Sequence, residues 1–193
     1  MVDVAFDLEG SRVPNGYAFA LWNELVRILP WLDAVDAAGV VPLRGAESDE
    51  GILLAKRSKL VLRLPAGMAG QAAALSGREL DLGSGALKVG MAVQRSLQPV
   101  ATLHSHLVES AGEEEIFLGK MASELAEMEV SCKWICGRSG NISVGGRSLS
   151  GYSLVLHDLK PEQSLRVQRA GLGGSRRFGC GIFMPYKTIS GLD

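Results

Sequence analysis

Residues suited to binding phosphate gather in one short segment near the C-terminus. Between Gly171 and Gly181 the chain places five glycines and the adjacent pair Arg176 and Arg177. Glycine allows positive φ and close approach to a ligand, and successive exposed backbone N–H groups form an anion-binding concavity. Arginine adds a planar, permanently charged fork that matches phosphate. The segment therefore predicts a phosphate-binding loop.

Two familiar glycine loops are excluded for this segment. A P-loop needs Gly-x-x-x-x-Gly-Lys-Ser/Thr, and neither lysine nor threonine occurs between residues 171 and 181. A dinucleotide loop follows a strand and opens a helix, whereas here a helical pattern comes first and a strand pattern second. The alternative interpretation is an ordinary surface turn between helix and strand.

The three histidines are the other residues suited to chemistry at neutral pH. His104 and His106 are two residues apart in a predicted strand, so their side chains share one face of it. His157 ends another predicted strand. An unperturbed histidine titrates near ~6.5, which suits general acid–base catalysis. A His-x-His pair also occurs in metal sites, but no third ligand lies nearby, so we expect no metal and no cofactor; a structural or surface role is the alternative.

The charge is distributed unevenly along the chain. The 193 residues carry 20 basic and 21 acidic side chains, for a net charge of −1. From residue 131 onward nine Lys/Arg stand against three Asp/Glu, giving +6, so the first 130 residues carry −7. This asymmetry favours a nucleic-acid face in the C-terminal third, and random scatter of charge is the alternative.

The cysteines and the hydropathy predict a reduced, soluble protein. Cys132, Cys136 and Cys180 form no even disulfide framework, which is typical of buried thiols in a cytosolic protein. No apolar run reaches membrane-spanning length. With 47% hydrophobic residues the chain can bury a core. We therefore expect a cytoplasmic globular protein.

The apolar spacing predicts the same order of elements in each half of the chain. In the second half, residues 113–128 have the clearest helical pattern, and Pro161 suits the first position of the helix that follows it. The first half is predicted as strand 2–8, helix 17–29, strands 40–44 and 52–64, helix 67–75 and strand 87–93. The second half is predicted as strand 100–108, helix 113–128, strand 130–136, a glycine-rich turn at 137–146, strand 153–157, helix 162–170 and strand 178–184.

Two βαββαβ units in tandem indicate an α+β fold with two ferredoxin-like (RRM-like) domains. We place these domains at residues 1–95 and 96–193, the second carrying the glycine-rich loop at 171–181. The open sheet face of this fold is a common RNA-binding surface. Trp134, on a strand of the second sheet, is a candidate for stacking on a base, with packing in the core as the alternative.

Four stretches of the sequence resemble one family. These stretches are residues 165–173, 177–185, 57–65 and 135–138. They are similar to CRISPR repeat-processing endoribonucleases of the repeat-associated mysterious protein superfamily, in particular the MYXAN subtype. The C-terminal glycine loop is the most diagnostic of the four stretches.

The resemblance implies a function. Such enzymes cut precursor CRISPR RNA at the base of the repeat stem-loop without a metal, by attack of the ribose 2′-OH that leaves a 2′,3′-cyclic phosphate. Many stay on the 3′ hairpin of the guide RNA in a Cascade-like surveillance complex with other subunits. The alternatives are a catalytically weak or inactive hairpin-binding subunit, and an unrelated ferredoxin-like enzyme whose loop holds a nucleotide phosphate.

The resemblance also directs attention to particular side chains. The family often places a histidine near the first helix, but no histidine precedes His104, and Tyr17 is the acid–base-capable residue at that place. The catalytic candidates are therefore Tyr17, His104, His106 and His157. The candidate RNA-binding residues are Arg166, Arg169, Gly171, Gly173, Gly174, Arg176, Arg177, Gly179, Gly181 and Lys187. Arg166 and Arg169 share one helix face, and a solvated helix face is the alternative interpretation for them.

Overall fold

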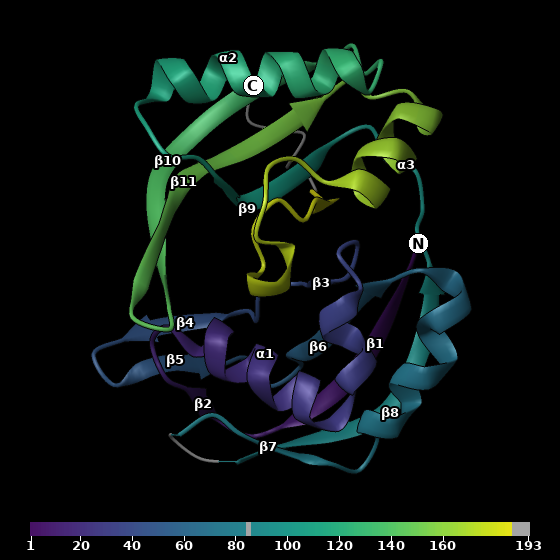
Figure 1. The fold of residues 1–193 in the computed structure, drawn as a ribbon, viewed down its shortest axis with the longest axis vertical. Helices are drawn as coiled ribbons and strands as arrows, with labels where there is room; N and C mark the ends of the chain where they lie inside the picture. The colour runs from purple at the N-terminus through teal and green to yellow at the C-terminus, as the bar shows by residue number, and fades with distance from the viewer. Residues whose placement is uncertain (84–85, 187–193) are drawn as a thin grey trace, which may run out of the picture. The chain divides into compact units, whose positions relative to one another are not determined.

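The computed structural model describes residues 1–83 and 86–186, and two units can be distinguished in it (Figure 1). The first unit contains Met1–Ser96 together with Ile142–Ser148 and Arg176–Gly179. The second unit contains the rest of the described chain. The domain limits of 1–95 and 96–193 stay predictions. No helix in the described residues is long and apolar enough to span a membrane.

The first unit is built on a five-stranded antiparallel sheet with the order β3-β6-β1-β8-β7. Its strands and helices are β1 (Val2–Glu9), α1 (Tyr17–Ile28), η1 (Pro30–Ala34), β3 (Gly39–Val40), β6 (Lys59–Leu64), η2 (Ala66–Leu75), β7 (Glu79–Asp81) and β8 (Ala86–Ser96).

The alternating side chains of β1 and β6 decide which face of this sheet is buried. Val4 and Phe6 of β1 lie opposite Leu62 and Leu60 of β6, and all four pack into the core of the unit. α1 covers this face with Leu21, Trp22 and Leu25, as its i+3/i+4 spacing predicts. Pro30 then ends the helix and starts a short 3₁₀ turn.

The predicted strand 52–64 is wrong as a single element. Residues 55–58 form a turn in which Ser58 N–H donates to the Ala55 carbonyl at 2.8 Å. This turn separates β6 from β5 (Gly51–Leu54), which belongs to a small sheet of order β2-β5-β4 with β2 (Arg12–Val13) and β4 (Gly45–Ser48). The predicted strand 40–44 is likewise reduced to the two residues of β3.

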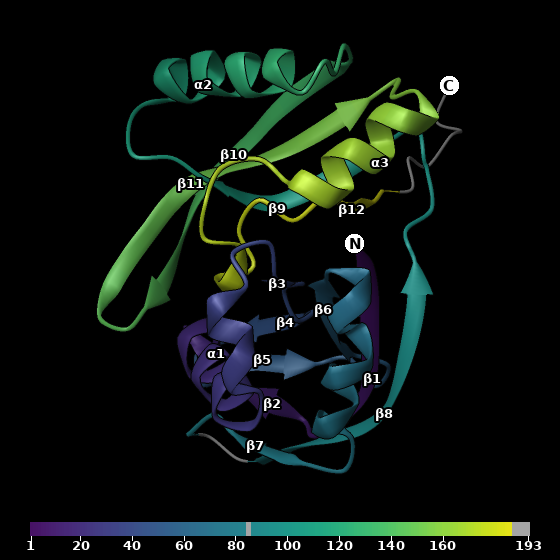
Figure 2. The same cartoon turned by 45° about the vertical axis from the view of Figure 1, so that its right-hand side comes forward.

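The second unit is built on a four-stranded sheet with the order β10-β11-β9-β12. Figure 2 shows its long β10–β11 hairpin with α3 in front. The elements are β9 (Leu103–Glu109), α2 (Glu114–Glu127), β10 (Lys133–Val144), β11 (Arg147–His157), α3 (Pro161–Ala170) and β12 (Met184–Pro185). The short 3₁₀ helix η3 (Arg176–Phe178) belongs to the first unit.

Both helices of the second unit cover the same face of its sheet. Phe117 and Met121 of α2 and Val167 of α3 share one core with Leu103 of β9 and Leu154 of β11. The strand order and the helix positions confirm the expected α+β fold of two ferredoxin-like halves. Among the residues that the structure describes, the opposite face of this sheet carries no helix of the second unit.

Two predictions in this half are wrong in their extent. Gly137 and Gly140 lie within β10 instead of a turn, and a side chain at Gly137 would collide with Ser153 of the paired strand. The turn is confined to Gly145 and Gly146, both at positive φ. The predicted strand 178–184 is reduced to β12, because Gly179 and Gly181 take φ of +91° and +65°, far from the negative φ of a regular strand.

Candidate functional site

His104 and His157 lie on the helix-free face of the second sheet. Leu103 and Ser105 of β9 are buried, so His104 between them points to the other face. In β11, Leu154 and Leu156 are buried, and His157 alternates with them onto the same face as His104. The pairing of β9 shifts register between Ser105 and Val108, so alternation alone does not place the exposed His106, and the face that it was expected to share with His104 stays a prediction.

The register of the strands places His104 between the other two imidazoles. His104 lies opposite Val155, so His157 is its diagonal neighbour across the strand pair. Such neighbours lie about 7–8 Å apart, and His106 lies roughly 7 Å from His104 along the strand. The ring of Tyr186 lies 5.3 Å from that of His104, centroid to centroid. Two imidazoles at this separation can act on opposite sides of one phosphate.

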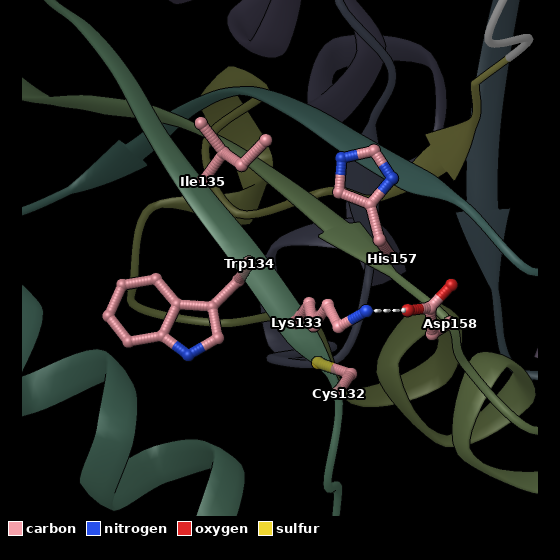
Figure 3. Close-up of a pocket in the computed structure, with 6 residues that line it drawn as sticks. All are labelled: Cys132, Lys133, Trp134, Ile135, His157 and Asp158. Carbon is pink, nitrogen blue, oxygen red and sulfur yellow. Dashed lines mark ion pairs between the residues drawn. The ribbon is translucent and has the colours of Figure 1, made fainter.

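A shallow pocket adjoins His157 at the edge of the same sheet (Figure 3). Its lining residues are Cys132, Lys133, Trp134, Ile135, His157 and Asp158. Lys133 Nζ lies 3.0 Å from Asp158 Oδ2, and His157 Nδ1 lies 3.5 Å from the Thr102 hydroxyl. The pocket thus presents an imidazole, an ammonium group and the apolar side chain of Ile135.

Trp134 does not point toward His157. Figure 3 shows its indole on the far side of β10 from the imidazole, and Trp134 packs against the core of the second unit. Core packing, the alternative stated for this residue, agrees with this position.

The glycine loop uses most of its backbone N–H groups internally. Gly171 N–H donates to the Val167 carbonyl and Gly181 N–H to the Leu107 carbonyl, each at 2.8 Å. Gly179 N–H donates to the Arg176 carbonyl at 3.0 Å. These glycines are needed for positive φ and close packing. An open concavity of free amides, as predicted for phosphate, is not what these groups form.

The remaining two glycines lie beside carboxylates. Gly173 N–H donates to Glu124 Oε2 at 2.8 Å. A Cβ atom at Gly174, which is exposed, would lie 3.0 Å from Glu109 Oε2. The first part of the loop therefore holds acidic groups of the protein itself, and phosphate binding by Gly171, Gly173, Gly174, Gly179 and Gly181 stays a prediction.

Arg177 is held against the first helix of the first unit. Its guanidinium carbon lies 5.6 Å from the ring centroid of Trp22, a cation–π distance. Asp33 Oδ1 accepts hydrogen bonds from Arg177 Nη1 at 3.4 Å and from Trp22 Nε1 at 3.2 Å. The Arg177 side chain is still 44% exposed. Its charge is therefore positioned and remains accessible to a ligand.

Arg176 has a different environment from its neighbour. Burial, followed by repulsion from Arg63, lowers the pKa of Arg176 to about 10. The guanidinium still carries its charge at neutral pH. Because Arg176 is partly desolvated and Arg177 is exposed, Arg177 is better placed to meet a phosphate.

The two arginines of α3 are both exposed. Arg166 donates to the Met128 carbonyl and lies 3.0 Å from Glu129 Oε2 at the end of α2. Arg169 forms no ion pair among the described residues. Their shared exposed helix face is confirmed, whereas their role in RNA binding stays a prediction. Lys187 lies outside the described residues.

Tyr17 is fixed by a backbone group and stays protonated at neutral pH. Its hydroxyl accepts a hydrogen bond from Leu43 N–H at 2.7 Å. Burial raises the pKa of Tyr17 to about 12, and the Leu43 hydrogen bond offsets part of that rise. Tyr17 therefore cannot serve as a general base near pH 7, although its own proton can still be donated.

Replacing Tyr17 by phenylalanine tests this conclusion. We expect Y17F to lower the free energy of unfolding by about 1–3 kcal/mol, because Leu43 N–H loses its acceptor, and to leave the pH dependence of any activity below pH 9 unchanged. Urea unfolding and a pH–rate profile would measure the two effects. A profile that loses one of its limbs in Y17F would show that Tyr17 titrates in the reaction.

Comparison with known proteins gives the family. The family model described as "Cas6 Crispr" matches residues 2–188. The chain belongs to the Cas6 family. It is also 33% identical to the CRISPR-associated endonuclease Cas6 of Myxococcus xanthus over 186 residues, which are 95% of this chain and 81% of that protein. The resemblance proposed from sequence is thereby confirmed.

Solved structures of Cas6 proteins have the same fold. A Cas6-related protein of Pyrococcus furiosus superposes with a TM-score of 0.68 at 13% identity, covering 95% of this chain and 97% of that chain. Thermus thermophilus Cse3, bound to an RNA representing a pre-cleavage complex, superposes with a TM-score of 0.55 at 13% identity, covering 95% and 97%. At these identities the likeness establishes the fold of the Cas6 chain.

Sequence reasoning missed the groups that hold this Cas6 chain's charged side chains in place. Trp22 and Asp33 were not singled out, since they lie more than 140 positions before Arg177. The Lys133–Asp158 pair was also missed, although Lys133 lies in one predicted strand (130–136) and Asp158 directly follows another (153–157). In the described residues no group of three His, Cys, Asp or Glu side chains is arranged to hold a metal ion.

Proposed function

We propose that this Cas6 protein cleaves CRISPR repeat RNA at the helix-free face of its second sheet. The observation that supports the proposal most directly is that His104 and His157 lie on that one face, with the exposed His106 two residues further along β9. Members of the family are CRISPR endonucleases, and a structural neighbour, Cse3, binds RNA. Imidazoles on an exposed sheet face suit an extended RNA strand.

His104 and His157 are proposed as the acid–base pair. Tyr186 packs beside the His104 ring and Thr102 lies next to His157 Nδ1, so both imidazoles have a neighbour that limits their motion. His106 is exposed and has no such neighbour among the described residues. Positioned groups contribute more to catalysis than mobile ones.

The proposed reaction is an in-line transesterification. One imidazole takes the proton of the ribose 2′-OH, and the 2′-oxygen forms a bond to the adjacent phosphorus. The bond from phosphorus to the 5′-oxygen breaks, and the second imidazole donates a proton to that oxygen. The products are a 2′,3′-cyclic phosphate and a 5′-hydroxyl. Lys133, at the edge of the same face, can attract the scissile strand.

A chelator-treated cleavage assay tests this proposal. We expect purified protein to cleave a synthetic repeat RNA in excess EDTA, and a 2′-deoxy nucleotide at the cut site to block cleavage, since the nucleophile is then missing. Cleavage that requires a divalent cation, or that proceeds on the 2′-deoxy substrate, would contradict the mechanism.

A second candidate is a subunit that holds the guide hairpin without cutting it. The absence of histidine from the first 103 residues and the raised pKa of Tyr17 favour it, because they leave the first unit without a neutral-pH base. Tight hairpin binding with no product under single-turnover conditions would support this candidate. Both candidate functions predict that the protein stays bound to guide RNA in a Cascade-like complex. Co-purification of the protein with guide RNA tests that prediction.

Arg177 and Arg176 should contribute unequally to RNA binding. We expect Arg177→Ala to weaken hairpin binding and to reduce the slope of log K against log salt by roughly 1, because its exposed charge is lost. Arg176→Ala should change the slope less, since that side chain is partly desolvated. Fluorescence anisotropy over a salt series would measure both. Equal slopes in R177A and wild type would contradict a role for the loop.

A further inference from the structure

Three cations lie together at the base of the small β4–β5 hairpin. Arg44 directly precedes β4, while Lys56 and Arg57 follow the end of β5 after Ala55. The pairing of Gly45 with Leu54 brings the start of β4 beside the end of β5. Arg44, Lys56 and Arg57 are all exposed. We call these three residues the hairpin-base patch.

Two hydrogen bonds hold this patch together. The buried Ser58 donates its hydroxyl proton to the Arg44 carbonyl at 2.8 Å, and Ser58 N–H donates to the Ala55 carbonyl at 2.8 Å. The turn that carries Lys56 and Arg57 is therefore fixed to the backbone of Arg44. These bonds fix the backbone positions of the three cationic residues relative to one another.

The cations of the patch have no acidic partners. Within residues 1–83 and 86–96, Arg44, Lys56 and Arg57 form no ion pair, and Arg78 and Arg95 share that property. The cations that do pair with carboxylates are Arg12, Arg27, Lys59, Arg63 and Lys88. The patch is distinguished by bringing three such cations together, whereas Arg78 and Arg95 are single.

The hairpin itself separates the two signs of charge. Asp49 and Glu50 lie at its tip, beyond the pair of Ser48 with Gly51, and Glu50 is bonded to Arg12. Four residues of strand separate the tip from the base, about 13 Å at ~3.3 Å per residue. Glu47, opposite Ile52 on the half of β4 nearer the tip, is a third acid of the hairpin. The acids thus lie toward the far end, and the charged residues at the base are the three cations.

We infer that the hairpin-base patch is a second RNA contact, which binds ribose-phosphate backbone away from the atoms that are cut. This inference rests on the proposed function. No aromatic residue lies among residues 44–58, so the patch has no ring on which a base could stack. It would contact phosphates and make no base-specific contacts. Its contribution is affinity and register, independent of RNA sequence. The phosphates come either from the repeat stem or from a single-stranded flank.

The test measures RNA binding by a charge-neutralised patch. Lys56→Gln with Arg57→Gln is compared with wild type by fluorescence anisotropy on a synthetic stem-loop with single-stranded flanks and on the same stem-loop without flanks. We expect affinity for the flanked RNA to fall on the order of tenfold at 150 mM salt. If the patch contacts a single strand, the slope of log K against log salt should fall by roughly 1.4, and binding of the bare stem-loop should be unaffected. If the patch contacts the stem, that slope should fall by roughly 1.8.

Arg78→Gln with Arg95→Gln is the matched control, because it removes two exposed, unpaired cations elsewhere in the same unit. It should bind both RNAs as wild type does. Equal binding by the patch variant and this control overturns the inference and leaves the patch to another ligand, such as an acidic protein surface. Failure of wild type to bind either RNA would instead contradict the proposed function, so the two failures are distinguishable.

Discussion

Replacing His104 by glutamine should slow repeat cleavage by about 10²–10⁴-fold, the range expected when a general acid or base is removed. Glutamine keeps a polar side chain of similar size on the sheet face but cannot exchange a proton at neutral pH. RNA affinity should stay within about threefold of wild type, because the change removes no positioned cation. Single-turnover cleavage in EDTA, together with anisotropy on a 2′-deoxy substrate, would separate the two effects.

The other two histidines provide the comparison for this result. His157→Gln should match the loss in H104Q, and the double variant should be little slower than either single one, because paired acid–base groups are not additive. His106→Gln should slow cleavage less than tenfold, since that imidazole has no neighbour holding it. Full cleavage activity in H104Q would contradict the proposal that the reaction takes place on the helix-free sheet face.

Replacing Asp3 by asparagine should lower the free energy of unfolding by about 3–5 kcal/mol, a large share of the 5–15 kcal/mol typical of a folded protein. Asp3 accepts two hydrogen bonds from Arg63, at 2.7 Å from Nε and 3.0 Å from Nη2. The Arg63 side chain is 0% exposed and Asp3 14%. Without the carboxylate a buried guanidinium keeps its charge but loses its counter-ion. Urea unfolding would measure the change.

The same strand offers a matched control for the Asp3 variant. Asp7 lies four residues further along β1 and pairs with Lys59 of the same neighbouring strand, but its side chain is 73% exposed. Asp7→Asn should cost no more than about 1 kcal/mol, as solvent screens the pair. Asp3→Leu combined with Arg63→Met should recover much of the loss seen in D3N. Similar destabilisation by D3N and D7N would show that burial does not govern the Asp3–Arg63 pair.

Local patterns were enough to predict the helices and the order of elements. The apolar spacing of Leu21 and Leu25, with Pro30 after them, set α1 to within one residue, and Pro161 marked the first residue of α3. The βαββαβ order followed from these elements and led to the correct fold. Strand alternation also predicted one face for His104 and His106, but it could not anticipate the register shift that follows Ser105.

The glycines were harder to interpret from sequence, because glycine serves two opposite purposes in this chain. Gly137 lies in a strand where a neighbouring side chain leaves no room for a Cβ atom, while Gly179 and Gly181 take positive φ and end a predicted strand. The sequence alone does not tell whether a glycine is needed because a neighbouring atom occupies the place of a Cβ atom or because the backbone takes positive φ. The environment of Arg177 was equally hidden, because Trp22 and Asp33 reach it only through the tertiary fold.

The hydrogen bond from Gly173 N–H to Glu124 has a consequence for small metabolites. An acceptor built into the chain acts at an effective concentration of millimolar or more. A free mononucleotide or inorganic phosphate would therefore have to displace this resident carboxylate and would also meet its negative charge. We therefore expect the loop to bind isolated phosphates weakly, which disfavours a nucleotide-dependent enzyme. A long polyanion that is anchored elsewhere on the protein does not depend on that amide.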